Sequence, residues 1–139
     1  MRLTAFLLVS VACLGGCGKP SVVGIWESTR EGDVHGKRTF SFKDDGTYTE
    51  YTSLNIDSTK SYLVIQSSGT YTFEDDTLVT NLIAGKQDVN MMETGEKGHI
   101  DLDPSTQTRK ISWFDSKKFS LFPDPKTGAG GPFPIFIKK

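Results

Sequence analysis

The stretch Phe40-Ser41-Phe42-Lys43-Asp44-Asp45-Gly46-Thr47-Tyr48-Thr49-Glu50-Tyr51 decides the fold class. On both sides of its centre, aromatic residues are interleaved with polar ones, which is the pattern of strands that bury one face. Gly46 tolerates the positive φ of a tight turn, and the carboxylate of Asp45 can accept hydrogen bonds from nearby amides. The stretch therefore predicts an antiparallel β-hairpin.

A similar pattern recurs along the chain. Tyr71-Thr72-Phe73-Glu74 leads through Asp75-Asp76-Thr77 into Leu78-Val79-Thr80, which predicts a second hairpin. No stretch of a dozen residues has a clean helical period. We therefore expect strands near residues 23–29, 37–43, 47–54, 61–66, 69–74, 77–83, 87–93, 108–114, 117–122 and 134–138.

Pairs of large apolar residues predict where the core lies. The two members of each pair are two positions apart, so their side chains leave the same face of a strand. The expected core residues are Phe40, Phe42, Tyr71, Phe73, Ile111, Trp113, Phe119 and Leu121. The run Tyr62-Leu63-Val64-Ile65 is apolar on both faces, which predicts either a central strand or contact with a lid, a ligand or a partner.

The length of 139 residues favours a single domain. The expected fold is all-β: a single antiparallel up-and-down β-barrel, or a splayed barrel-like sheet, of about 8–10 strands. With 16 basic and 17 acidic residues, the net charge of −1 gives no electrostatic footprint for nucleic acid. Both cysteines, Cys13 and Cys17, lie near the N-terminus, so we expect no disulfide inside the domain.

Residues 1–16 are expected to be a signal peptide. Arg2 gives a short positive start, and the apolar run at 3–14 is shorter than the roughly 20 residues that a membrane-spanning helix needs. Leu14-Gly15-Gly16-Cys17 resembles the lipobox of bacterial lipoproteins, which implies cleavage before Cys17 and acylation of its thiol. The alternative is an ordinary secretory leader that leaves Cys17 as a free thiol.

The lipobox resemblance also implies a location. Residues 17–21 would form a lipidated tether, and acyl chains such as palmitate would hold the protein on a membrane of the bacterial cell envelope. Gly18, rather than aspartate, follows the cysteine. By analogy with enteric bacteria, this permits sorting to the periplasmic face of the outer membrane in a source with two membranes.

A second resemblance concerns residues 22–122. Val23-Gly24-Ile25-Trp26 resembles the Gly-x-Trp motif in the first strand of lipocalins and of bacterial lipocalin-like domains. The stretches at 40–48, 68–78 and 111–121 are similar to later hairpins of that family, in the same order. The segment 80–103 matches the family poorly, which leaves open whether a barrel closes or stays splayed. The expected lipocalin-like domain extends over residues 22–139.

The family resemblance implies a structural role for Gly24 and Trp26. In that family the tryptophan closes one end of the barrel, often beneath a basic side chain from a late strand. Arg109, Lys138 and Lys139 are all candidates for that side chain. The resemblance further implies a binding domain whose interior holds a small apolar ligand.

Residues with catalytic or metal-binding chemistry form no convincing constellation in the sequence. His35 and His99 are far apart and are expected at the surface, and Asp44-Asp45 and Asp75-Asp76 are explained by turns. No nucleophile elbow or phosphate-binding loop is present, so we expect neither an enzyme nor a cofactor or metal. Met91-Met92 could line a ligand cavity, although core packing is the favoured interpretation.

Two functions are therefore weighed. The first is a membrane-anchored envelope lipoprotein whose small β-barrel-like domain binds a small apolar ligand. The alternative is a protein-interaction or inhibitor module of the cell envelope without a small-molecule ligand. The loop at 124–132 and the aromatic segment at 133–136 motivate the alternative.

Overall fold

The computed structural model describes residues 20–91, 94–123 and 134–139. In these residues the chain forms nine strands and no helix. The strands are β1 (Gly24–Arg30), β2 (Val34–Phe42), β3 (Thr47–Ile56), β4 (Ser61–Glu74), β5 (Thr77–Met91), β6 (Glu96–Asp101), β7 (Ser105–Asp115), β8 (Lys118–Pro123) and β9 (Ile135–Lys138). The expected signal peptide, Cys17 and the loop at 124–132 lie outside the described residues.

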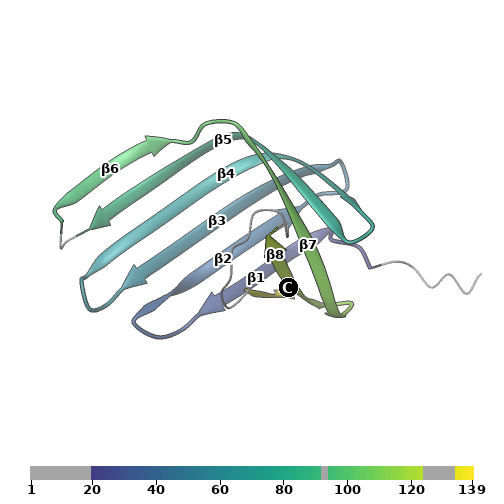
Figure 1. The fold of residues 1–139 in the computed structure, drawn as a ribbon, viewed down its shortest axis with the longest axis horizontal. Helices are drawn as coiled ribbons and strands as arrows, with labels where there is room; N and C mark the ends of the chain where they lie inside the picture. The colour runs from purple at the N-terminus through teal and green to yellow at the C-terminus, as the bar shows by residue number, and fades with distance from the viewer. Residues whose placement is uncertain (1–19, 92–93, 124–133) are drawn as a thin grey trace, which may run out of the picture.

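The strands form a closed antiparallel barrel in the order β1-β2-β3-β4-β5-β7-β8-β9, and β9 pairs back onto β1 (Figure 1). β6 is an additional strand that pairs with β5. The all-β, up-and-down barrel expected from the sequence is therefore confirmed, and its strand number lies within the expected range. This architecture is consistent with a lipocalin-like fold.

The barrel is closed along only part of its length, because β6 and β7 share one edge of β5. β7 pairs with residues 77–82 of β5, whereas β6 pairs with residues 86–91. Residues 102–104 separate the two strands, and Pro104 has no amide hydrogen to donate to a sheet. In Figure 1, β7 crosses in front of the sheet from this point, while β6 stays on the outer edge.

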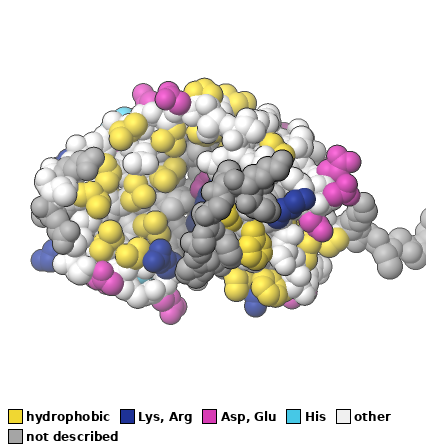
Figure 2. Space-filling model, viewed as in Figure 1, with side chains coloured by type: hydrophobic (Ala, Val, Ile, Leu, Met, Phe, Trp, Pro, Cys, Tyr) yellow, Lys and Arg dark blue, Asp and Glu magenta, His cyan; other side chains and the backbone are white. Residues whose placement is uncertain are grey.

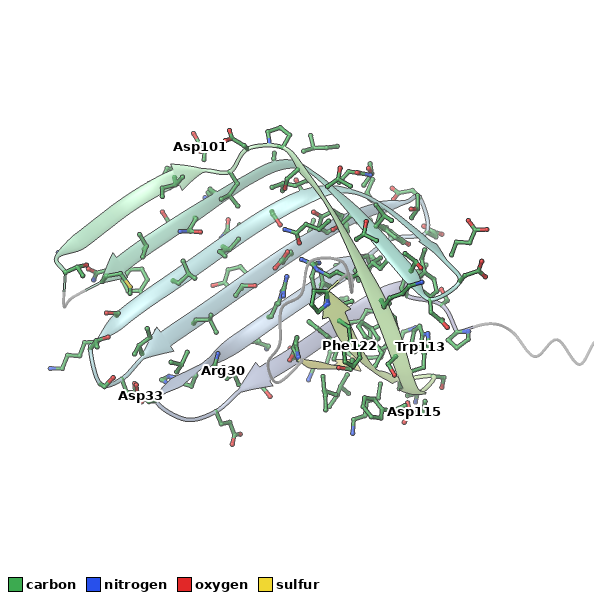
Figure 3. The ribbon with its side chains drawn as sticks, in the orientation of Figure 1. Arg30, Asp33, Asp101, Trp113, Asp115 and Phe122 are labelled. Atoms are coloured by element: carbon green, nitrogen blue, oxygen red, sulfur yellow. The ribbon has the colours of Figure 1, made fainter. Side chains whose placement is uncertain are left out.

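The resulting parts are called here the closed half and the open half. The closed half is the ring completed by β1, β7, β8 and β9, and the ladder between β1 and β9 is short, pairing Trp26 with Lys138 and Glu27 with Ile137. The open half consists of the ends of β2–β5 that extend beyond this ring, together with β6. Figure 3 shows Asp101 on the upper rim of the opening, and Arg30 and Asp33 on the lower rim.

Aromatic side chains fill the closed half. Trp26, Phe40, Phe119 and Phe136 have no exposed surface, and each ring packs on at least one of the others. Burying each such side chain stabilises the fold by roughly 1.5–3 kcal/mol. All eight expected core residues are confirmed: Phe40, Phe42, Ile111, Phe119 and Leu121 are buried, and Tyr71, Phe73 and Trp113 pack against them.

A β-bulge in β5 determines which residues face the interior of the open half. Gly69 pairs with Leu82 and Ser68 pairs with Ala84, so Ile83 is an extra residue in β5. The inward side chains therefore change from even-numbered positions before the bulge to odd-numbered positions after it. Without the bulge, Val89 would face outward.

The strand boundaries expected near the middle of the chain were wrong. β4 and β5 are each one continuous strand, where the sequence predicts two shorter strands with breaks at 67–68 and 84–86. Small residues at these positions suggest turns, but the backbone there pairs with neighbouring strands, and this pairing keeps both strands extended. β6 was not predicted, because its polar sequence has no alternating pattern.

The Gly-x-Trp motif lies where the first and last strands of the barrel meet. Trp26 is fully buried, and its indole N–H donates a 2.6 Å hydrogen bond to the carbonyl oxygen of Val22. The basic side chain over the Trp26 ring belongs to Lys138 in β9. Lys139 instead pairs with Glu27, and Arg109 lies in the barrel interior. The choice among the three candidates is thereby resolved.

Candidate functional site

The inner face of the open half is apolar and is not covered by another element of the described structure. It holds a cavity of about 340 Å³ lined by Val34, Leu54, Ile56, Tyr62, Leu63, Gln87, Val89 and Met91. We call this cavity the groove. Figure 2 shows hydrophobic side chains gathered over this part of the molecule, to the left of β7. The volume lies within the usual range for small-molecule sites, about 300–1,000 Å³.

Strand register explains why these side chains converge. Directly paired residues of neighbouring strands lie on the same face of a sheet, and the register pairs Leu54 with Leu63 and Leu63 with Val89. Ile100 of β6 pairs with Gln87 and extends the same face, where it is 48% exposed. The four strands that line the groove, β2–β5, and the added β6 therefore contribute to one continuous apolar surface.

The opposite, outer face of the open half is mainly polar. There Lys97 pairs with Asn90, and His99 pairs with Asp88. The open half thus has the amphipathic pattern of a sheet that packs on a core, but its apolar face is only partly buried. Removing that face from water would be favourable in proportion to the apolar area covered.

A layer of polar side chains separates the groove from the aromatic core. We call it the polar belt, and its members are Arg38, Tyr48, Glu50, Ser67, Thr80, Gln107 and Arg109. The belt lines a second interior cavity of about 190 Å³. Gln87 lines both this cavity and the groove, so the two spaces are adjacent.

The two cations of the polar belt, Arg38 and Arg109, differ in their hydrogen-bond partners. Nε of Arg38 donates a 2.7 Å hydrogen bond to Oε1 of Glu50, and the Thr52 hydroxyl donates to the same oxygen at 3.2 Å. Arg109 donates to the amide oxygen of Gln107, a neutral partner. Within the described part of the chain, no ion pair is found for Arg109.

Burial changes the titration of two groups in the belt. It lowers the pKa of Arg109 to about 10, and the nearby positive charge of Arg38 acts in the same direction while Glu50 opposes it. Burial also raises the pKa of the Tyr48 phenol, with the charge of Glu50 adding to the effect. Arg109 and Tyr48 are therefore partly shielded from water, and the positive charge of Arg109 is costly to maintain there.

The two histidines lie away from the groove. His99 is exposed on the outer face, where Nδ1 is 2.7 Å from Oδ1 of Asp88 and Nε2 is 3.4 Å from Oδ1 of Asp101. His35 lies near Asp57, with 3.5 Å between Nδ1 and Oδ2. Among the described residues, no group of three or more His, Cys, Asp or Glu side chains is arranged to hold a metal ion.

The acidic pairs sit in turns, as expected. Asp45 accepts hydrogen bonds from the backbone N–H and the hydroxyl of Thr47, at 2.9 Å and 2.6 Å. Asp75 and Asp76 both have positive φ in the turn between β4 and β5. Turn formation therefore accounts for both pairs.

The structure corrects the interpretation of Met91, and Met92 lies outside the described residues. Met91 lines the groove rather than packing into the core. Sequence reasoning also missed Arg38, and it considered Arg109 only as a candidate to cover Trp26. A signal was present, because each precedes an inward pair by two positions: Arg38 stands before Phe40, and Arg109 stands before Ile111. Period-two alternation therefore places both cations inside the barrel.

No protein-family model matches the chain, and no curated protein matches it at a significant level. Across the described ranges, no helix is long and apolar enough to cross a membrane. Fold and site together define a β-barrel domain with a half-open apolar interior, which is compatible with a binding domain.

Proposed function

We propose that this chain is a membrane-anchored lipoprotein of the bacterial cell envelope whose barrel binds a small apolar ligand in the groove. The observation that carries the binding proposal is the partly exposed apolar inner face of the open half. In the closed half the corresponding face is covered by aromatic side chains. A ligand in the groove would provide the missing cover.

The anchoring part of the proposal rests on the lipobox-like segment Leu14-Gly15-Gly16-Cys17. Acylation of Cys17 would insert the chain terminus into a bilayer, and two or more acyl chains give stable attachment. β1 begins at Gly24, only seven residues after Cys17. At most about 3.6 Å per residue, this linker would hold the barrel within about 25 Å of the membrane surface. The proposed location is the periplasmic face of the outer membrane in a source with two membranes.

We propose binding rather than catalysis because the interior is organised as an apolar surface above a polar layer. Within the part of the chain that the structure describes, both histidines lie on outward-facing positions of their strands. No imidazole base therefore faces the groove from these residues.

The alternative, a protein-interaction module, was motivated by the loop at 124–132, which lies outside the described residues, and by the aromatic segment that follows it, which supports the alternative less well. Residues 135–138 of the C-terminal segment form β9 between β1 and β8. Phe136 is fully buried in the aromatic core and is not available to a partner. The groove is therefore the better supported binding surface.

Filling the groove tests the binding proposal. Gly98 of β6 pairs with Val89, and a Cβ atom at Gly98 would approach no heavy atom closer than 4.0 Å, at Cγ1 of Val89. Gly98→Leu should therefore place a side chain in the groove without a backbone clash. Lys97→Leu is the matched control, because Lys97 is exposed on the outer face of the same strand.

The measurement is a titration of the mature chain from residue 17, carrying Cys17→Ser, with the neutral apolar fluorophore N-phenyl-1-naphthylamine. We expect saturable binding by the parent chain and by Lys97→Leu, and at least a tenfold loss of affinity in Gly98→Leu. Absence of binding by the parent, or equal affinity in Gly98→Leu, would contradict the proposal.

Separately, the protein with Cys17 intact should partition into membranes and incorporate a palmitate analogue, and Cys17→Ser should abolish both.

A further inference from the structure

We infer that the ligand is a single-chain amphiphile with a carboxylate head, bound with its head against Arg109 in the polar belt and its alkyl chain along the groove. The inference rests on the proposed function, and it adds the chemical class of the ligand. It follows from the charge of the belt, the space beside Arg109 and the order of the layers along the barrel.

The polar belt carries an excess positive charge. Two guanidinium groups, those of Arg38 and Arg109, face the cavity together with one carboxylate, that of Glu50. Glu50 is already bonded to Arg38 and Thr52. Among the described residues Arg109 has no ion pair, and the charge of Glu50 offsets only part of the cost of burying it, so a bound anion would relieve that cost. Because a guanidinium presents several N–H donors in a plane, a carboxylate is a well-matched partner.

The cavity beside Arg109 has room for such a head group. Its volume is about 190 Å³, and its lining includes the hydroxyl groups of Ser67 and Thr80 and the amide of Gln107. These groups can donate further hydrogen bonds to carboxylate oxygens. A cationic head would instead meet two arginines. A neutral head would leave Arg109 uncompensated.

The order of the layers orients the ligand. Arg38 and Arg109 lie over Phe40, with their guanidinium carbons 4.8 Å and 6.0 Å from the ring centroid. Phe40 belongs to the packed core, so the belt is the blind end of the space. In the other direction β2 continues from Arg38 to Val34, a rise of about 13 Å at 3.3 Å per residue. An alkyl chain would extend from the belt along this apolar length towards the opening.

The test compares one fluorescent ligand with and without its charge. The mature chain from residue 17 with Cys17→Ser contains every strand of the barrel, and it is titrated at pH 7.4 with cis-parinaric acid and with the methyl ester of that acid. We expect the acid to bind at least tenfold more tightly than the ester. Dodecanoate should displace the bound acid, whereas dodecylamine at the same concentration should not.

Arg109→Gln removes the proposed partner of the head group, and Arg109→Lys retains a positive charge there. Lys110→Gln is the control, because Lys110 is the next residue of β7 and is exposed. Arg109→Gln should lower the affinity for the acid about tenfold and leave the affinity for the ester unchanged. Arg109→Lys should keep part of the preference, and Lys110→Gln should keep all of it.

Three results would contradict either the carboxylate inference or the proposed function on which it rests. Equal affinity of the parent chain for acid and ester would overturn the carboxylate inference, while the proposed apolar binding would stand. An unchanged preference for the acid in a folded Arg109→Gln variant would exclude Arg109 as the partner of the head group. If the parent bound neither ligand, the proposed function itself would fail. The comparison of acid with ester in the parent chain does not depend on any variant being folded.

Discussion

The ammonium nitrogen of Lys138 lies 5.4 Å from the centroid of the Trp26 ring, so the last strand of the barrel covers the tryptophan of the first. Gly24 makes room for this arrangement. A Cβ atom at Gly24 would lie 2.7 Å from Cε of Lys138, and the backbone there has a φ of +131°. The glycine and the tryptophan of the motif are thus linked through one lysine.

Gly24→Ala should destabilise the barrel by roughly 1–3 kcal/mol, mainly because alanine rarely adopts this backbone conformation. Lys138→Ala should cost about 0.5–1 kcal/mol through loss of the cation–π contact. In the double variant most of the stability loss caused by Gly24→Ala should remain, because removing the Lys138 side chain does not change the unfavourable φ at residue 24. Urea unfolding measures all three free energies of unfolding. Complete rescue by Lys138→Ala would show that the side-chain contact, rather than φ, is limiting.

A second glycine, Gly69, is needed at the bulge in β5. A Cβ atom there would lie 1.9 Å from the carbonyl oxygen of Asn81, which is backbone and cannot swing aside. Gly69→Ala should therefore destabilise the fold by about 3 kcal/mol or more. Gly98→Ala should cost less than about 1 kcal/mol, since its new methyl group meets only ordinary contacts. Guanidinium denaturation of both variants provides the comparison, and equal stabilities would contradict the assigned register.

The bulge also explains which parts of the fold were predictable. The hairpins around Gly46 and Asp75-Asp76, and the aromatic core, follow from alternation and turn residues that lie close together in the sequence. The continuity of β5 does not, because the extra Ile83 reverses the inward phase within a single strand. A phase change of this kind looks like two strands when only the sequence is read.

The groove was equally hard to foresee. Its lining comes from four strands, and only the register shows that Leu54, Leu63 and Val89 lie side by side. The apolar run at 62–65 was expected either in a central strand or in contact with a lid, a ligand or a partner, and β4 is a central strand, paired with both β3 and β5. Two members of the run, Leu63 and Ile65, line the groove and the adjoining cavity. The polar belt could not be predicted from the sequence, because arginine and glutamate side chains are usually exposed.

The imidazole of His99 should titrate above its ordinary range. The hydrogen bond to Asp88 is the main cause of the raised pKa, and the charge of Asp101 adds to it. Because the pKa of His99 is raised above 6.5 in the folded state, protonation of His99 stabilises the fold. This contribution to the free energy of unfolding is complete below pH 6.5 and is lost as the pH rises through the folded-state pKa. An NMR titration of the His99 ring should give a pKa above 6.5, and Asp88→Asn should lower it. A value unaffected by Asp88→Asn would contradict this contact.

Arg109 should cost stability in the ligand-free protein. Its pKa is lowered to about 10 by burial, so the folded state disfavours its charged form at neutral pH, and this cost declines only as the pH rises above about 10. At about 1.4 kcal/mol per pKa unit, Arg109→Met should raise the free energy of unfolding by up to about 3 kcal/mol. Urea unfolding without ligand tests this. A variant less stable than the parent would show that Arg109 instead supports the fold.

The most direct test of the central claim is an NMR titration of methyl-labelled protein with dodecanoate. Because Leu54, Leu63 and Val89 line the groove, their methyl resonances should shift and saturate as dodecanoate is added. Those of Leu78 and Leu121, which are buried in the closed half, should change little. No shift of the groove methyl groups, or shifts confined to the closed half, would contradict the account.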